Sequence, residues 1–156
     1  MKIEERKISP DELNITPEAI AILMGIKEDP LPEPYLSMIN DELSLLQNYT
    51  NISGGFSFTK NIKIDYQKNV FYAEDKLFQP GKQVMNFLKN AESFAFFICT
   101  AGEQISERSR ELLAKDQVLE SYIADLLGSV IVEEAMDIIH KELSEDMEKQ
   151  GLKTTN

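Results

Sequence analysis

The sequence predicts an α+β domain with an antiparallel sheet, flanking helices and one long buried helix. Three observations support this class. Apolar residues recur at helical spacing in the first 50 residues, alternate with polar residues between Ser53 and Phe78, and recur at helical spacing again after Gln117. No internal repeat or second domain boundary is visible along the chain. We therefore expect a single domain over residues 1–156, with N-terminal helices in 1–50 and the sheet and long helices in 51–156.

Composition bears on the compartment and the partners. The 156 residues carry a formal charge of −11, which disfavours nucleic acid and anionic membrane surfaces as partners. The N-terminal stretch MKIEERK is charged, and no apolar run approaches the roughly 20 residues needed to cross a bilayer. The single cysteine cannot form an internal disulfide. We expect a cytoplasmic protein.

Prolines divide the helices of the N-terminal third. Thr-Pro before Glu18–Met24, with glycine after it, predicts a short capped helix. The three prolines in Glu28–Pro34 predict a linker. The next segment, Tyr35–Tyr49, has the spacing of an amphipathic helix, with Asp41 and Glu42 facing solvent.

Between Ser53 and Phe78 the period changes to two, which predicts antiparallel strands in the segments GFSFTK, IKIDY and VFYA. Gln67-Lys68-Asn69 is a hairpin connection between the second and third segments, and Gly54-Gly55 indicates a turn or bulge. A short helix over Lys82–Leu88 follows Pro-Gly.

The apolar run Phe94–Cys99 predicts a strand covered on both faces, in which the cysteine is a small buried hydrophobe. The spacing in Thr100-Ala-Gly-Glu103 is that of a capping box and predicts a helix start. That helix would end near Lys115 and point three residues inward, namely Ile105, Leu112 and Leu113.

Asp116 can cap a second helix that runs from Gln117 to the high 140s. Its apolar residues fall on two opposed sides, so we expect it to be buried between layers. Gly128 lowers helix propensity, which indicates that another element packs closely there. The first stripe comprises Ile123, Leu127, Val130, Ile131 and Ile138, and the second comprises Val132, Met136, Ile139 and Leu143.

Glu134 lies within the first of these stripes. An unpaired charge there would cost several kcal/mol, so we expect this carboxylate to meet either a bound ligand or a buried Arg or Lys. Other chemical signals are weak, because the chain has no Gly-rich phosphate loop and no Cys/His metal spacing. A solvated side chain is a simpler interpretation of His140 than a metal ligand. A plain helix cap is a simpler interpretation of the Thr100 turn than an anion-binding site, although a helix start can also bind an anion.

Three stretches together carry a family resemblance. They are Cys99-Thr-Ala-Gly-Glu, Tyr122-Ile-Ala-Asp-Leu-Leu-Gly-Ser129 and Val132-Glu-Glu-Ala135. With the preceding elements in the same order, the chain resembles the activation domain of vitamin B12-dependent methionine synthase, and in particular the stand-alone versions of that domain. The resemblance covers nearly the whole chain, from about Ile8 to Asn156.

The resemblance implies a twisted antiparallel sheet and a domain that binds S-adenosylmethionine. Such a domain presents the methyl donor to the cobalamin of methionine synthase or another corrinoid protein, so that cob(II)alamin is reductively methylated. The cofactors supply the chemistry, which makes the chain an accessory to a methyltransferase rather than an independent catalyst. An acidic residue on the long helix contributes to the family's ligand pocket. Glu134 is the position carried over, with Glu133 as the alternative.

One departure from the family concerns the C-terminus. The family's Arg and Pro-Gly-Tyr ligand motif would follow Asn156, so the resemblance implies a domain that is incomplete at its C-terminus and binds S-adenosylmethionine poorly. Two other functions stay open. One is a truncated, non-catalytic interaction module that docks on a corrinoid protein, and the other is an unrelated small acidic ligand-binding domain.

Overall fold

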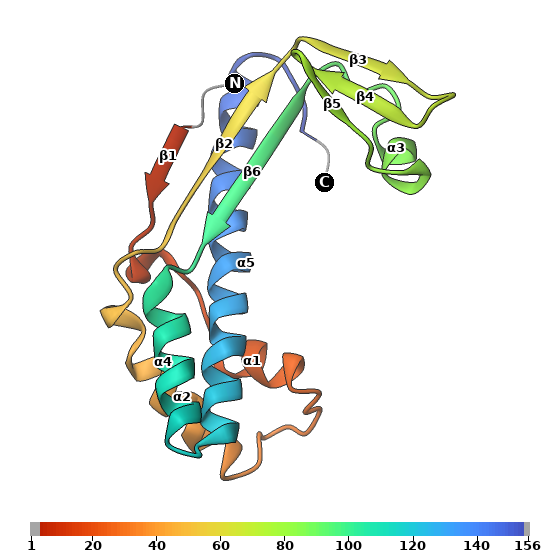
Figure 1. Cartoon of the computed structure of the whole chain (residues 1–156). Helices are drawn as coiled ribbons and strands as arrows, with labels where there is room; N and C mark the ends of the chain where they lie inside the picture. The colour runs from red at the N-terminus through yellow and green to blue at the C-terminus, as the bar shows by residue number, and fades with distance from the viewer. Residues whose placement is uncertain (1–3, 155–156) are drawn as a thin grey trace. The chain divides into compact units, whose positions relative to one another are not determined.

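The computed structural model describes residues 4–154 and contains two small antiparallel sheets and a long C-terminal helix, which confirms the α+β class (Figure 1). The residues form two compact units. Of the described residues, the hairpin unit contains residue 4 and residues 55–97, and the helical unit contains residues 5–54 and 98–154. The chain passes between the units within β2 (Ser53–Thr59) and again within β6 (Phe94–Thr100). None of the described helices combines the length and apolarity of a membrane span.

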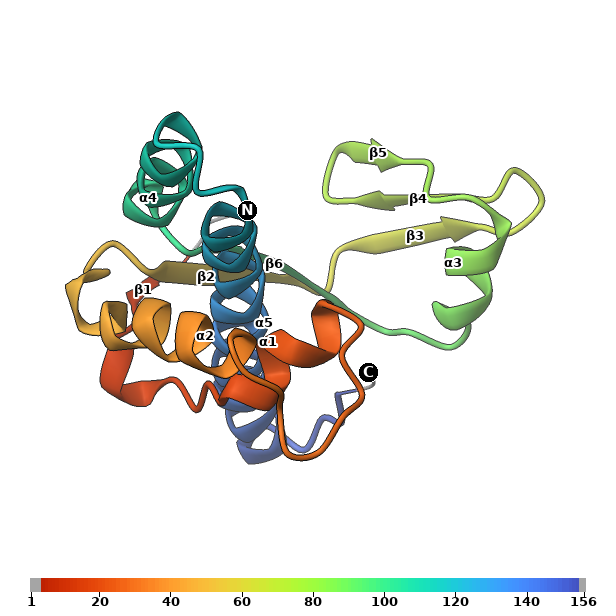
Figure 2. The same cartoon turned by 90° about the horizontal axis from the view of Figure 1, so that it is seen from below.

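The hairpin unit contains a three-stranded sheet in the order β3-β4-β5, with a short helix beside it (Figure 2). Asp65 pairs with Val70, and its Oδ1 accepts hydrogen bonds from the backbone N–H groups of Gln67 and Lys68 at 3.0 and 3.1 Å. The predicted hairpin connection is therefore confirmed. The sequence did not predict β5, which is too short to show alternation. The elements are β3 (Ile62–Asp65), β4 (Val70–Ala73), β5 (Lys76–Phe78) and α3 (Lys82–Phe87).

Aromatic rings form the core of the hairpin unit. The Phe71 ring stacks on Phe78 with the centroids 4.9 Å apart and meets Phe94 edge-on at 4.7 Å. Both are favoured geometries for aromatic pairs. Met85 of α3 is buried against the same cluster, so the helix covers one face of the sheet.

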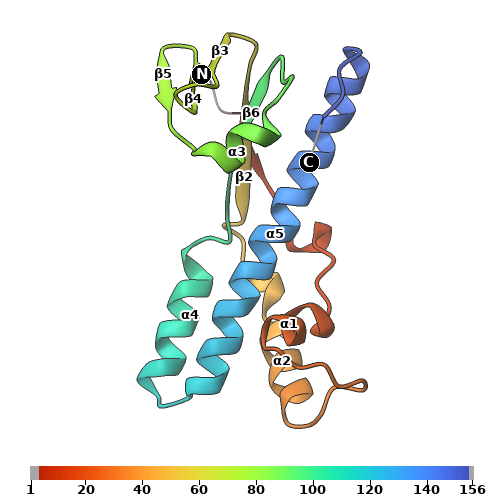
Figure 3. The ribbon, with the colours of Figure 1, turned by 90° about the vertical axis from the view of Figure 1, so that its right-hand side faces the viewer.

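The helical unit packs short helices around α5 (Val118–Lys149), one continuous helix of 32 residues (Figures 1 and 3). This confirms the predicted long helix. Helix α4 (Glu103–Ala114) lies along α5, and α1 (Pro17–Leu23) and α2 (Tyr35–Ser44) also pack against it. Two 3-10 turns complete the unit, η1 (Pro10–Glu12) and η2 (Leu46–Asn48).

The start and end of α1 follow the predicted local signals. Thr16 Oγ1 accepts from the backbone N–H of Ala19 at 3.4 Å, and Pro17 occupies the first helical position. Gly25 ends the helix with φ +79°.

The second sheet has the order β1-β2-β6, where β1 spans Glu4–Lys7. Among the described strands, β6 therefore lies at an edge rather than between neighbours. Ile98 of β6 is 63% exposed, so the prediction that this strand is covered on both faces is wrong. An apolar run alone does not separate a buried strand from an edge strand with one uncovered side.

Burial along α5 explains its two apolar stripes. The buried residues of the first stripe lie in the first half of the helix, and the buried residues of the second stripe lie in the second half. Met136 of the second stripe is 45% exposed, so neither stripe is buried along the whole helix. Because buried positions repeat mainly every four residues, the buried line rotates about 40° per repeat. The buried apolar residues are Ile123, Ala124, Leu127, Val130, Ile131, Ala135, Ile139, Leu143 and Met147.

Gly54 and Gly55 lie inside β2, so a turn at Gly54-Gly55 is excluded. A Cβ at Gly54 would lie 2.3 Å from Ile139 Cδ1 and 2.8 Å from Cys99 Sγ. These distances are shorter than van der Waals contact. The glycine is therefore required where α5 approaches the start of β2.

We predict that Gly54→Ala destabilises the fold by roughly 2 kcal/mol, because the added methyl group overpacks this contact. Ile139→Val removes the Cδ1 atom that meets it, so Gly54→Ala/Ile139→Val should lose less stability than the sum of the single variants. Urea unfolding of all three variants measures this. Strict additivity would contradict the packing assignment.

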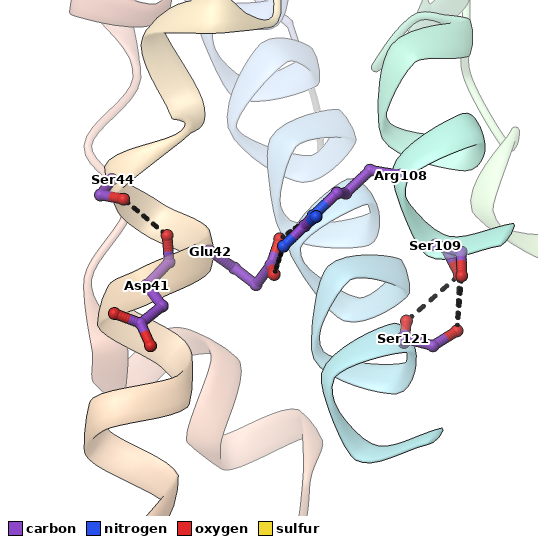
Figure 4. A network of polar contacts seen from close by, with 6 residues as sticks. All are labelled: Asp41, Glu42, Ser44, Arg108, Ser109 and Ser121. Atoms are coloured by element: carbon purple, nitrogen blue, oxygen red, sulfur yellow. Dashed lines mark hydrogen bonds and ion pairs between the residues drawn. The ribbon is translucent and has the colours of Figure 1, made fainter. Parts of the chain in front are cut away.

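Helix α2 ends five residues earlier than expected, and its outward face is misassigned in the prediction. Asp41 is exposed, but Glu42 is only 2% exposed. The Glu42 carboxylate accepts hydrogen bonds from Arg108 Nη2 at 2.7 Å and Arg108 Nε at 3.2 Å (Figure 4). This two-bond ion pair raises the pKa of Arg108 and joins α2 to α4. Burial raises the pKa of the adjacent Tyr49, and the charge of Glu42 adds to the effect.

We predict that Arg108→Met destabilises the fold by roughly 3 kcal/mol, because it leaves the buried Glu42 carboxylate without its cation. Glu42→Met/Arg108→Met should recover most of the loss, since no buried charge remains. Chemical denaturation at neutral pH tests both. Arg110→Met, on the exposed side of α4, is the control and should change stability by less than about 0.5 kcal/mol. A double variant as unstable as Arg108→Met would contradict the ion-pair explanation.

Candidate functional site

The candidate site is a groove of about 480 Å³ within the helical unit. It lies between the end of β6 with the two residues that follow it, the first turn of α4 and the middle of α5. We call it the acidic groove, because the charged residues among its described lining are two carboxylates, Asp125 and Glu133. The remaining lining residues are Cys99, Thr100, Ala101, Gly102, Ile105, Ser106, Gly128, Ser129 and Val132.

The end of β6 forms one wall of the groove through a tight turn. Thr100 Oγ1 accepts from the backbone N–H of Gly102 at 3.1 Å, and Gly102 has φ +82°. A Cβ on Gly102 would lie 2.9 Å from the Asn51 carbonyl oxygen, so only glycine fits. The helix begins at Glu103 with Gly102 as its N-cap and no side-chain cap, which shows that the predicted Thr100–Glu103 capping box is wrong.

Helices α4 and α5 approach closely where they form the groove floor. A Cβ at Gly128 would lie 3.4 Å from two carbons of Ile105, which confirms the predicted close packing. Nearer the connection between α4 and α5, Ser109 and Ser121 form hydrogen bonds with each other. Ser121 Oγ donates to the Ser109 carbonyl at 2.9 Å, and the two hydroxyls lie 3.1 Å apart (Figure 4). These contacts hold the two helices at a fixed separation.

Two predictions about these helices are wrong, one about a side chain that faces inward and one about a helix cap. Leu113 is 55% exposed rather than directed inward, while Ile105 and Leu112 are buried as expected. Asp116 does not cap α5, because Gln117 is the N-cap and Asp116 adopts φ +60° in the connection. The three-residue link between α4 and α5 needs this left-handed residue to reverse direction, and Asp tolerates it.

The two candidate ligand residues from the sequence, Glu133 and Glu134, have different surroundings in the structure. Glu133 is exposed and lines the acidic groove, whereas Glu134 does not line it. The half-buried Glu134 Oε2 accepts from the backbone N–H of Asn14 at 3.2 Å. Its carboxylate therefore meets a peptide N–H, instead of the buried Arg or Lys that one reading of the sequence anticipated. His140 does not line the groove either.

Two groove residues, Asp125 and Ser129, were not singled out from the sequence. With Glu133 they repeat every four residues, and together with Val118, Tyr122 and Met136 they form the exposed stripe of α5. This stripe is the outward face of α5. In the sequence, polar residues that recur every four positions in the middle of an apolar helix are the signal that could have identified them.

Charge decides what the acidic groove can bind. Neither Asp125 nor Glu133 forms an ion pair with another described residue, and no described Lys or Arg lines the groove. The carboxylates oppose an anion at the start of α4, although its free N–H groups would favour one. The hydroxyls of Thr100, Ser106 and Ser129 add neutral hydrogen-bond partners. The groove is therefore suited to a cationic ligand that also carries polar groups.

Comparison with known proteins assigns no family to the chain, since it matches none of the protein-family models and no curated protein. Within residues 4–154, no three or more His, Cys, Asp or Glu side chains are arranged to hold a metal ion.

Cys99 is a free, partly buried thiol at the groove wall, and burial raises its pKa. We predict that iodoacetamide alkylates Cys99 more slowly in the native protein than in the urea-unfolded chain at pH 7–8, because less thiolate is present. The native rate should rise with pH through a midpoint above the roughly 8.5 of a free thiol. Mass spectrometry of quenched reactions follows the rate. Native alkylation as fast as in the unfolded chain would contradict this.

Proposed function

We propose that the acidic groove binds S-adenosylmethionine, and that the chain serves as an activation module for a cobalamin-dependent methionine synthase or a related corrinoid protein. The observation that supports this proposal is that one groove holds two carboxylates, Asp125 and Glu133, neither of which forms an ion pair within residues 4–154. The sulfonium and amino groups of S-adenosylmethionine are cations that such carboxylates attract. A carboxylate bonded to a charged group contributes about 1.5–3 kcal/mol.

The rest of the groove suits the neutral parts of this ligand. Its volume of about 480 Å³ lies within the range typical of small-molecule sites. Ile105 and Val132 offer apolar surface for an adenine ring, and Ser129 and Thr100 offer hydroxyl groups for the ribose. In this assignment Glu133, the alternative of the two glutamates, is the ligand residue. Glu134 has a structural role through Asn14.

A second candidate function is that of an interaction module that docks on a corrinoid protein without binding a small molecule. It is favoured by the exposed apolar residues on the same stripe of α5, namely Val118, Tyr122 and Met136. An exposed apolar patch rimmed by polar residues is typical of a protein-interaction site. The unrelated acidic ligand-binding domain is the third candidate. It would use the same groove for another cation.

We predict that Glu133→Gln weakens S-adenosylmethionine binding by roughly ten- to a hundredfold, because it removes the charge that faces the ligand cation. Glu134→Gln is the matched control and should leave the affinity unchanged. S-adenosylhomocysteine, which lacks the sulfonium charge, should bind more weakly than S-adenosylmethionine to the unchanged chain. NMR titration, followed by the shift changes at Ser129 and Gly128, is the suitable measurement.

The same titration separates the alternatives. No shift changes with S-adenosylmethionine would refute the ligand proposal and leave the interaction module. Shift changes in the groove with spermidine but not with S-adenosylmethionine would favour an unrelated cation-binding domain. Loss of binding in Glu134→Gln but not in Glu133→Gln would place the ligand outside the acidic groove.

A further inference from the structure

Charge is distributed unequally along the chain. Residues 55–97 of the hairpin unit contain six Lys and four Asp or Glu, a net charge of +2. The rest of the chain contains ten Lys or Arg and 23 Asp or Glu, a net charge of −13. The overall charge of −11 therefore conceals a basic part. At physiological ionic strength charges interact over about 8 Å, so local charge decides what each surface attracts.

One row of side chains across the β3-β4-β5 sheet is exposed and contains a lysine, whereas Val70 on the same face is buried. The strand register places Lys63, Tyr72 and Leu77 in one row across the three strands, and all three side chains are exposed. The next row, Ile64, Phe71 and Phe78, points to the opposite face and packs in the aromatic core. Lys68 adds a second cation beside Asp65, with 78% of its side chain exposed. We call Lys63, Lys68, Tyr72 and Leu77 the basic sheet face.

A complementary surface exists on the same chain. The exposed stripe of α5 combines apolar side chains with the carboxylates Asp125 and Glu133, as described above. A helix lying on a sheet is a common packing arrangement, and here each surface supplies the charge that the other lacks.

We propose that the basic sheet face of one copy docks on the exposed α5 stripe of a second copy. A second copy is the occupant for which both complementary surfaces are present in the structure. Each copy offers one surface of each kind. The proposed assembly is a closed two-fold dimer in which each copy uses both surfaces, and the tyrosine and leucine of the sheet row cover apolar residues of the partner helix. The proposal does not depend on ligand binding in the acidic groove.

Sedimentation velocity of the whole chain, from about 10 µM to 1 mM, tests the proposal, because this range spans weak dimer affinities. We expect twice the monomer mass at high concentration and dissociation at roughly 0.5 M salt. Lys63→Glu/Lys68→Glu and Asp125→Lys/Glu133→Lys should each be monomeric, because like charges would then face each other. An equimolar mixture of the two variants should dimerise again, since both contacts regain opposite charges.

Two further variants keep the test decisive. Lys82→Glu/Lys89→Glu makes the same charge change elsewhere in the hairpin unit and should dimerise like the unchanged chain. If the charge reversals unfold the protein, as circular dichroism would show, Tyr72→Ser replaces them and should weaken the dimer at least tenfold. A monomer at every concentration overturns the proposal, and so does a dimer that the reversals do not weaken. A monomer that binds single-stranded DNA through Lys63 and Tyr72 would assign the face to an anionic polymer instead.

Discussion

The geometry of the helical unit depends on one buried carboxylate. Glu42 lies on α2, where a charge without a partner would cost several kcal/mol, and its partner Arg108 lies on α4. The ion pair therefore specifies how these two helices lie against each other. The same α4 carries Ile105 and Ser106, which form a wall of the acidic groove. A contact outside the groove thus helps to determine its width.

Elements whose ends depend on local chemistry were predictable from the sequence. Thr16 and Pro17 start α1, and Asp65 and Asn69 form the hairpin connection. In each case the decisive groups lie within four residues of one another. Turn and cap chemistry can be read at that range without knowledge of the fold.

Which side of a helix is buried was harder to predict than where the helices and strands lie in the sequence. Glu42 was expected in solvent because its cation, Arg108, lies 66 residues away in the sequence. Glu133 and Glu134 are adjacent in the chain, yet they point in directions about 100° apart on the helix, which is enough to separate a groove residue from a structural one. Thr100 fitted a cap by spacing, but the positive φ of Gly102 turns the chain before the helix begins. These outcomes depend on the surrounding packing, which a single sequence does not show.

The line of buried residues winds around α5 instead of following one side of it. Because that line advances about 40° for every four residues, an axial slide of about 6 Å needs a matching rotation to keep the same side chains covered. A pure slide or a pure rotation would bring polar positions such as Ser129 toward the interior and expose Ile131 or Ile139. Sliding and rotation of α5 against its neighbours are therefore coupled. Any displacement that a ligand or partner produces at one end of α5 would reach the other end as a coupled turn and translation.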